Sequence, residues 1–300
     1  MFHYVRDLKN SLYPKIKGLD YYDFLEQIKF LKKEYNIISI EDFIRDEYKK
    51  NKKTCVLTFD DGYVDHYDFV FPTLINENIK GSFFSPVDTI VDHKLLDVNL
   101  IHIILASSDE NRILERIIYH YERMGNSIPI TTYISSINTY SRYDTKTTII
   151  IKRLLQTVLP LDIRSIICRL LLEDFVELEE KTLSKSFYLS KENIKEMISE
   201  GMHFGSHGKS HLWFSSLDEN EQEKEIKSSI NFLNSLYKKD FDLTMCYPYG
   251  NYNEKTINLL KKYKFKLALT TIPETYNKEK DTLFEIPRWD TNDYYPKKKR

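Results

Sequence analysis

The sequence predicts an α/β protein built on a parallel β-sheet, with a helical insertion. In residues 1–87 and 187–300, short apolar runs rich in β-branched and aromatic residues alternate with longer segments of helical period. The polar residues suited to chemistry come directly after the apolar runs, as they do at the C-terminal ends of parallel strands. This alternation is compatible with a closed (β/α) barrel and with an open doubly wound sheet.

The first part of the chain begins the alternation. Phe24, Ile28 and Leu31 recur at helical spacing and form one apolar stripe of a helix. We expect strands at residues 2–5, 36–40, 54–59 and 81–85, and helices at residues 20–31 and from the third strand to about residue 77.

Residues 88–186 show helical periodicity without clear strands. The expected helices cover residues 111–123, 144–158 and 162–178. His102 and His120 lie in this block, where we expect surface or packed histidines. The chain is therefore predicted to contain one α/β domain, 1–87 and 187–300, interrupted by a helical insertion, 88–186, that shapes a substrate cleft or an oligomer contact.

The alternation resumes near residue 187. Ser190 is a candidate N-cap for a helix over residues 191–200, and Gly201 is a candidate C-terminal stop before a strand that leads to His207. The later expected elements are a helix over 218–239, a strand over 241–247, a helix over 254–263, a strand over 265–271 and a last extended segment over 283–290.

Composition excludes several classes of function. The 44 basic and 45 acidic residues balance, which argues against a nucleic-acid partner. Three scattered cysteines predict no disulfide framework and a reducing compartment. No secretory signal and no run of ~18 apolar residues are visible, which predicts a cytoplasmic protein, or one at the inner membrane surface, without a transmembrane span. We expect the basic run 297–300 to be a solvated tail.

Residues 58–63 hold the first motif, TFDDGY. Asp60 and Asp61 stand at the exit of an apolar strand, and Gly62 supplies a turn. Two carboxylates that converge on one pocket need a cation or a shared proton. The alternative is that Asp-Asp-Gly serves only as turn chemistry.

Residues 206–211 hold the second motif, SHGKSH. His207 and His211 are four residues apart, a spacing that brings both imidazoles to one side of a helical turn or a loop. Two neutral imidazoles and one carboxylate form a common catalytic zinc set, which leaves a position open for water. A single His-x-x-x-His would more often be incidental.

Together with YPYG at residues 247–250, these motifs resemble, in the same order, the polysaccharide deacetylases of the NodB-homology type, carbohydrate esterase family 4. The resemblance covers residues 54–87 and 188–290. The opening forty residues resemble the branch that carries its acid histidine near the N-terminus. The resemblance implies an irregular parallel (β/α) barrel of about seven strands.

The resemblance also implies a set of site residues. Asp61, His207 and His211 would hold Zn²⁺, although Co²⁺ or Ni²⁺ suits the same ligands. Asp60 would be the catalytic base, and the backbone N–H of Tyr249 would stabilise the oxyanion. Our own candidates for substrate contact are Tyr63, Pro248 and Trp289. We expect Trp289, in the segment PRWD, to wall the pocket under the acetyl methyl group.

The chain departs from the family in the residue expected to act as the catalytic acid. Relatives often use a histidine of a Leu-x-His motif near the C-terminus, whereas residues 267–271 read LALTT and no histidine follows His211. Our candidate is His3, in the segment FHYV at residues 2–5, which resembles the Tyr-His-x-Val opening of that branch. The first and last strands of a closed barrel are neighbours. The acid residue can therefore be carried by either strand and still occupy nearly the same place in space. A frayed surface histidine is the alternative.

Two other histidines are alternative acids. His66 follows the first motif closely, but we expect it on a helix surface. His203 lies one strand step away from His207.

A second departure concerns the arginine that usually begins the third motif and orients the base. Cys246 occupies that place. Arg288, in the segment PRWD, is the predicted replacement beside Asp60, and an ordinary surface ion pair is the alternative.

These features predict a metal-dependent hydrolase that removes N-acetyl groups from an N-acetylhexosamine. The expected substrate is a cell-surface polysaccharide or its lipid-linked precursor. Two alternatives stay open, namely an O-acetyl sugar esterase that uses the same site and a metal-free glycan-binding remnant.

Overall fold

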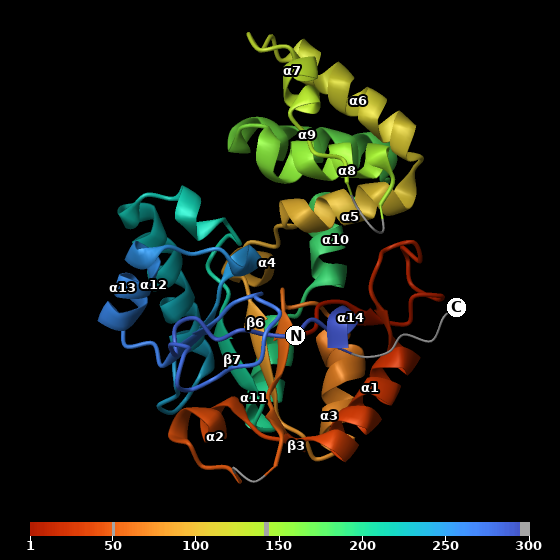
Figure 1. Cartoon of the computed structure of the whole chain (residues 1–300). Coiled ribbons are helices and arrows are strands. Elements are labelled where there is room, and N and C mark those ends of the chain that lie inside the picture. The colour runs from red at the N-terminus through yellow and green to blue at the C-terminus, as the bar shows by residue number, and fades with distance from the viewer. Residues whose placement is uncertain (50–51, 141–143, 295–300) are drawn as a thin grey trace. The chain divides into compact units, whose positions relative to one another are not determined.

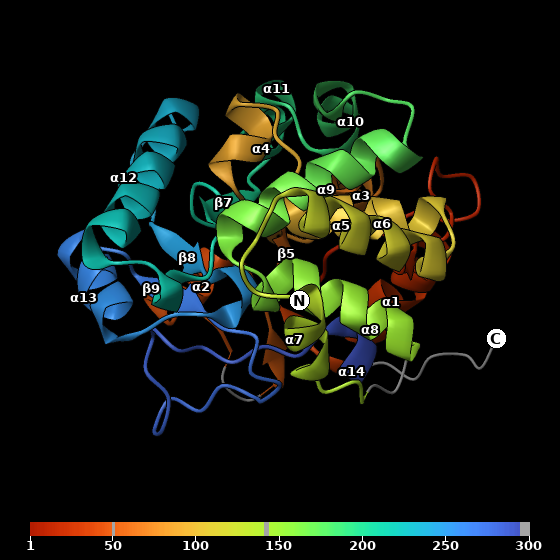
Figure 2. The same cartoon turned by 90° about the horizontal axis from the view of Figure 1, so that it is seen from above.

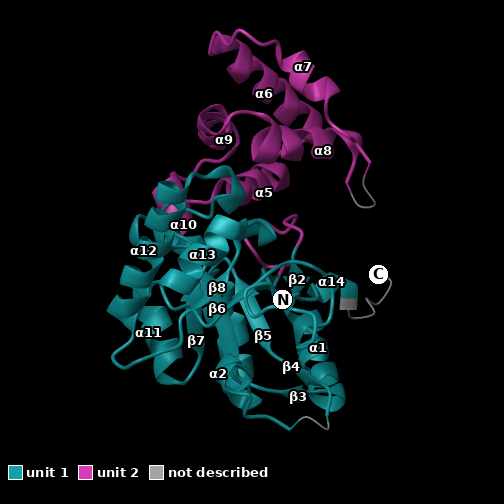
Figure 3. Ribbon diagram, turned by 60° about the vertical axis from the view of Figure 1, so that its left-hand side comes forward, with its two compact units in different colours: residues 1–7, 18–94, 185–300 teal, residues 8–17, 95–184 magenta. Residues whose placement is uncertain are grey.

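The structure is a computed structural model that describes residues 1–49, 52–140 and 144–294. It divides into two compact units, drawn in two colours in Figure 3. Unit 1 comprises Met1–Asp7, Gly18–Lys94 and Lys185–Arg300, and unit 2 comprises Leu8–Lys17 and Leu95–Ser184. The basic run 297–300 lies outside the described residues.

The centre of unit 1 is a sheet of five parallel strands in the order β5-β6-β7-β8-β9. The strands are β5 (Leu57–Asp60), β6 (Gly81–Ser85), β7 (His203–Ser206), β8 (Thr244–Cys246) and β9 (Leu267–Leu269). All five are buried along their length. The α/β prediction is therefore confirmed.

An additional extended segment lies on each edge of the sheet. Phe2 bridges Phe59 of β5, and Ile286 bridges Leu269 of β9, both in parallel. The two edge segments also meet, because the Met1 nitrogen donates to the Trp289 carbonyl at 2.6 Å. Five strands and two bridged segments match the predicted irregular barrel of about seven strands.

Successive side chains of a strand point to opposite faces of the sheet, so one face carries apolar core residues and the other carries polar residues of the site. Phe59, Phe83 and Phe204 are register partners on neighbouring strands, and their rings stack at centroid distances of 4.8 and 5.3 Å. Thr58 and Asp60 flank Phe59 and therefore point to the other face, where both accept hydrogen bonds from Arg288.

Helices follow the strands of unit 1, and α12 and α13 lie side by side in both views (Figures 1 and 2). Ser190 caps α11 through a capping box with Asn193, and Gly201 follows the helix end at φ +83°, so both predicted signals are confirmed. The helices are α1 (Tyr21–Glu34), α2 (Ile40–Arg45), a π-helix (His66–Val70), α3 (Phe71–Asn76), α4 (Val87–Val91), α11 (Lys191–Ser199), α12 (Glu219–Leu236), α13 (Glu254–Lys262) and α14 (Thr291–Tyr294), with 3₁₀ turns at Phe214–Ser216 and Pro248–Gly250.

Unit 2 is helical, and its described residues form no strand. Its helices are α5 (Asp97–Ser107), α6 (Glu110–Arg123), α7 (Ile130–Ser135), α8 (Lys146–Arg153), a π-helix (Leu154–Val158) and α9 (Leu161–Phe175), and α10 (Glu180–Phe187) begins in this unit. His120 is a packed histidine, as expected, because its Nε2 lies 2.6 Å from Asp174 Oδ2.

Several predicted strands are shorter than their apolar runs. The run 54–59 is divided between β4 (Thr54–Cys55), which pairs with β3 (Asn36–Ile37), and β5 in the central sheet. The run 36–40 stops early because Ser39 caps α2. The run 2–5 supplies only the Phe2 bridge and the start of β1 (Val5–Arg6), which pairs with β2 (Leu19–Asp20). The segment 283–290 supplies one bridge.

Among the described helices, none is both long and apolar enough to span a bilayer.

Candidate active site

Asp61, His207 and His211 converge at the C-terminal ends of β5 and β7. Asp61 Oδ1 lies 3.3 Å from Nε2 of each histidine, and all three side chains are buried. Asp61 has φ +73° and Gly62 has φ +68°, so the chain turns sharply after β5. This turn brings together the three residues that the two sequence motifs predicted.

The groups behind the triad fix its orientation. His207 Nδ1 donates to the Cys246 carbonyl at 2.7 Å, which leaves Nε2 facing Asp61. A protonated His207 donates from Nε2 to Asp61, and a neutral His207 would offer the Nε2 lone pair to a cation. The Tyr63 hydroxyl donates to Asp61 Oδ2 at 2.7 Å. Tyr63 was expected to contact substrate, but its side chain is only 1% exposed and lies behind Asp61.

The triad fits a divalent cation. One ligand atom from each residue lies within 4.8 Å of the others, and two imidazoles with one carboxylate suit zinc and its neighbours. Burial opposes the charge of Asp61, but hydrogen bonds with His207 and His211 hold its pKa well below the ordinary value. Asp61 is therefore a carboxylate at neutral pH.

Asp60 lies beside the triad and is paired with Arg288. The guanidinium donates from Nη1 to Oδ1 at 3.0 Å and from Nη2 to Oδ2 at 2.7 Å, and both side chains are buried. Burial opposes ionisation of Asp60, but the charge of Arg288 outweighs it and lowers the pKa of the carboxyl group below its ordinary value. The structure thus places Arg288 where the sequence predicted it.

The remaining donors of Arg288 are also used. Nε donates to the Thr270 carbonyl at 2.8 Å, and Nη1 donates to Thr58 Oγ1 at 3.0 Å. The Cys246 thiol accepts from Nη2 at 3.0 Å and donates to Asp60 Oδ2 at 3.3 Å. Burial raises the pKa of Cys246, so the residue stays a neutral thiol within this network.

His3 is the histidine nearest to Asp60 apart from the two histidines of the triad. Its Nε2 lies 4.0 Å from Asp60 Oδ2, and its side chain is 39% exposed. The accessible His3 side chain therefore lies next to the buried carboxylate of Asp60.

The two alternative acids lie elsewhere. His66 was expected on a helix surface, but it is fully buried, and its Nε2 donates to the His3 carbonyl at 2.8 Å. Burial lowers the pKa of His66 to about 4. His203, at the start of β7, is bonded to Glu41 and Thr244, each at 2.7 Å, at the opposite end of the strand from His207.

Aromatic rings line one side of the triad. The Tyr249 ring meets His211 edge to face at a centroid distance of 4.5 Å and stacks on Trp213 at 4.5 Å, with an interplanar angle of 9°. Pro248 begins the same 3₁₀ turn and is buried. Sequence reasoning missed Trp213, for which the only signal is its position two residues after His211.

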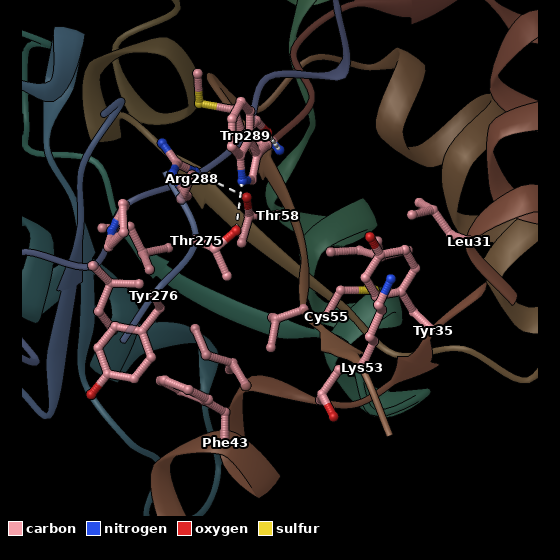
Figure 4. A pocket seen from close by; sticks show the side chains of 18 of the residues that line it. Leu31, Tyr35, Phe43, Lys53, Cys55, Thr58, Thr275, Tyr276, Arg288 and Trp289 are labelled. Carbon is pink, nitrogen blue, oxygen red and sulfur yellow. Dashed lines mark hydrogen bonds between the residues drawn. The ribbon is translucent and has the colours of Figure 1, made fainter. Parts of the chain in front are cut away.

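Trp289 lies on a separate pocket of about 820 Å³, shown in Figure 4. Its indole donates to Thr275 Oγ1 at 3.1 Å, and the side chain is 38% exposed. The pocket shares Thr58 and Arg288 with the network around Asp60, but the described residues that line it include none of the triad. Arg288 therefore lines this pocket and also pairs with Asp60.

Comparisons with known proteins agree with this geometry. Over 93 residues the chain is 28% identical to YxkH of Bacillus subtilis (strain 168), which is named as a polysaccharide deacetylase. That match covers 31% of this chain and about a third (33%) of the length of YxkH.

Two solved structures have a similar fold at low identity. Streptococcus pyogenes deacetylase PplD, in complex with acetate, is 17% identical with a TM-score of 0.54, and the match covers 96% of this chain and 89% of that one. The de-N-acetylase from Aggregatibacter actinomycetemcomitans is 14% identical with a TM-score of 0.55, covering 96% and 92%. The family model described as polysaccharide deacetylase matches residues 47–268, most of the chain. The chain therefore belongs to the polysaccharide deacetylase family.

Proposed function

We propose that this protein is a metal-dependent deacetylase that removes N-acetyl groups from an N-acetylhexosamine of a surface polysaccharide or its lipid-linked precursor. The observation that carries the proposal is the convergence of Asp61, His207 and His211 beside the Asp60–Arg288 pair. Family membership supports the carbohydrate substrate, and one solved structure of similar fold is that of a de-N-acetylase.

Asp61, His207 and His211 would hold the cation, with zinc as our first choice and cobalt or nickel as chemically similar alternatives. A bound divalent ion lowers the pKa of water and polarises an acyl oxygen. Tyr63 orients Asp61 through its hydroxyl, and the Cys246 carbonyl orients His207. We therefore assign Tyr63 to support of the ligand and no longer to contact with substrate.

Asp60 is the proposed base. Arg288 keeps its carboxylate ionised and fixes the plane of both oxygens, so that Asp60 can accept a proton from the attacking water. His3 is the proposed acid, because hydrolysis of an amide needs a proton for the departing amine and His3 is both close to Asp60 and accessible. The backbone N–H of Tyr249 is the proposed oxyanion donor.

The proposed substrate-binding surface is aromatic. The stacked rings of Tyr249 and Trp213 lie next to His211, where a sugar ring can pack against them. Pro248 would support this surface from behind. Trp289 lines the separate pocket, so we assign it a smaller part in substrate contact than the sequence predicted.

The test combines metal analysis of the purified protein with acetate release from a panel of N-acetylated glycans. We expect about one equivalent of a divalent transition metal, and acetate release that stops after chelation and returns when the metal is restored. Asp61→Asn should abolish both properties. A folded protein that binds no metal and releases no acetate from any substrate would instead support the glycan-binding remnant.

An O-acetyl esterase is the second enzymatic candidate, because an ester has a better leaving group and depends less on an acid. The panel therefore includes O-acetylated sugars. Faster turnover of O-acetyl than of N-acetyl groups would favour the esterase.

A further inference from the structure

The loop that joins the two histidines is held on both sides by buried carboxylate residues. Its three central residues are Gly208, Lys209 and Ser210. Their N–H groups donate to side-chain oxygens, and the carbonyl groups of Gly208 and Lys209 accept N–H bonds from the start of α4. The loop between the metal ligands is therefore fixed by surrounding side chains as well as by its own backbone.

Glu225 of α12 holds one side of this loop. Its Oε2 accepts the N–H of Lys209 at 2.7 Å and that of Ser210 at 2.8 Å, and the side chain is 7% exposed. Gly208 has φ +73°, and a Cβ there would lie only 3.2 Å from the same oxygen. Glycine thus supplies both the left-handed turn and the space for the carboxylate.

Asp88 of α4 holds the other side. Its side chain accepts a hydrogen bond from Ser210 Oγ at 3.0 Å and pairs with the Lys209 ammonium at 2.7 Å. Its own N–H donates to the Lys209 carbonyl at 2.9 Å. Asp88 is 5% exposed, whereas the Lys209 side chain is 36% exposed, so the carboxylate is the buried member of this pair.

A third contact ties the loop to α12. The Gly208 N–H donates to Ser206 Oγ at 3.2 Å, and Ser206 in turn donates to Ser229 Oγ at 2.7 Å. Glu225 and Ser229 are one helical turn apart. One face of α12 therefore supports the whole segment from the end of β7 to Ser210.

We propose that Glu225 is a positioning residue that, together with Asp88, sets the spacing of His207 and His211 before the metal binds. A loop that is ordered only by the metal spends part of the binding free energy on that ordering, whereas a loop fixed in advance does not. Outer partners of metal ligands typically change metal affinity by about 10–100-fold. This inference rests on the proposed metal site and adds residues that contact neither metal nor substrate.

The test measures Zn²⁺ affinity of the full-length apoprotein by competition with a chromophoric chelator. Glu225→Ala should weaken binding about 10–100-fold. Glu225→Gln keeps an oxygen that can accept both N–H bonds and should stay within about threefold of wild type. Glu225→Asp retains the charge but has a shorter side chain, so its Zn²⁺ affinity should lie between those of the alanine and glutamine variants. It replaces the alanine variant in the test if that variant does not fold.

Glu223→Ala is the matched control. Glu223 lies on the same helix and is paired with Lys262 at 2.7 Å, away from the loop. It should leave the metal affinity unchanged. The Co²⁺ absorption spectrum gives a second readout, which should change for Glu225→Ala and not for Glu223→Ala.

Wild-type affinity in Glu225→Ala or Glu225→Asp would overturn the inference, and so would a glutamine variant as weak as the alanine variant. If the wild-type protein itself bound no metal, the proposed function would fail instead. The two failures are therefore distinguishable.

Discussion

Arg288 shows how one charge can be supplied from a different part of the chain. The family resemblance places an arginine at position 246, where this chain has Cys246. Both residues contact Asp60, because β9 lies between β8 and the bridged segment at Ile286 and brings their side chains to one carboxylate. Arg288 therefore supplies the guanidinium beside Asp60 from a different segment of the chain.

Removal of Arg288 should change the pH dependence of catalysis. Burial raises the pKa of Asp60, and Arg288 is the main group that lowers it, so the pKa would rise without the guanidinium and the ionised Asp60 would be lost at a higher pH. We expect Arg288→Ala to move the acid limb of the kcat/KM profile to higher pH and to lower the rate at neutral pH at least tenfold. The measurement is a pH–rate profile from pH 4 to 9.

Arg288→Lys is the control for that experiment, since it retains the charge without the two-pronged contact. It should shift the acid limb less than the alanine variant does. Breaking a buried pair also costs about 3–5 kcal/mol of stability, so both variants are compared at a temperature where each is folded. An unchanged profile in a folded alanine variant would rule out the role of Arg288.

His3 should matter more for amides than for esters. An amine needs protonation before it departs, whereas an alkoxide of a sugar is a better leaving group. We expect His3→Gln to lower N-deacetylation by about 10²–10⁴-fold and O-deacetylation by much less. Parallel acetate-release assays measure both. Equal losses on the two substrates would show that His3 serves another purpose.

At the scale of elements, the sequence predicted the order of strands and helices well. Elements with a strong periodic signal in the sequence begin and end within a few residues of their predicted bounds, as α1, α11, α12 and β6 do. Strand lengths were predicted less well. Buried apolar runs continue past the hydrogen-bonded ladder, and only pairing with a neighbour decides where a strand ends.

The missed residues have a common cause. Trp213 and Glu225 carry no motif, and their relevance depends on what lies next to them in the folded chain. Glu225 in particular looks like one more charged residue on a polar helix. Which face of α12 supports the histidine loop is a tertiary fact that periodicity does not contain.

The turn after β5 offers a test at this scale. Gly62 has φ +68°, and a Cβ there would lie 2.4 Å from Ser85 Oγ. Gly62→Ala should therefore destabilise the protein by about 2 kcal/mol or more, since both the backbone and the packing are strained. Urea unfolding measures this loss, and Zn²⁺ affinity should fall with it because Asp61 is displaced.

Gly125 is the matched control. Its φ is +67°, but a Cβ added there would meet nothing within 4 Å. Gly125→Ala should show the backbone cost alone, about 1–2 kcal/mol. If the two variants lost the same stability, close packing against Ser85 would contribute nothing.

For the whole molecule, the contacts around Asp60 depend on closure of the barrel. His3 and Arg288 lie near opposite ends of the chain, yet both reach Asp60, because the first and last extended segments join at Met1 and Trp289. The sequence predicted this neighbourhood only through the family resemblance. We propose that residues 88–186, which include most of unit 2, are an insertion that leaves this closure intact.

His66 contacts the first extended segment of the barrel and makes the stability of the folded chain depend on pH. It is buried with Nε2 on the His3 carbonyl, and burial lowers its pKa from 6.5 to about 4. Between these values the unfolded chain binds a proton that the folded chain does not. The contribution of His66 to the free energy of unfolding therefore falls as the pH drops from about 6.5 towards 4.

We expect the wild-type protein to lose about 2 kcal/mol more stability than His66→Gln between pH 7 and pH 4.5. Glutamine can still donate to the His3 carbonyl but does not titrate. Burial raises the pKa of Asp65 to about 6, which acts in the opposite direction, but Asp65 is present in both proteins and cancels in the difference. Urea unfolding at the two pH values, with chelator present so that metal loss does not contribute, gives the result. Parallel stability curves for the two proteins would mean that His66 does not titrate differently in the folded chain.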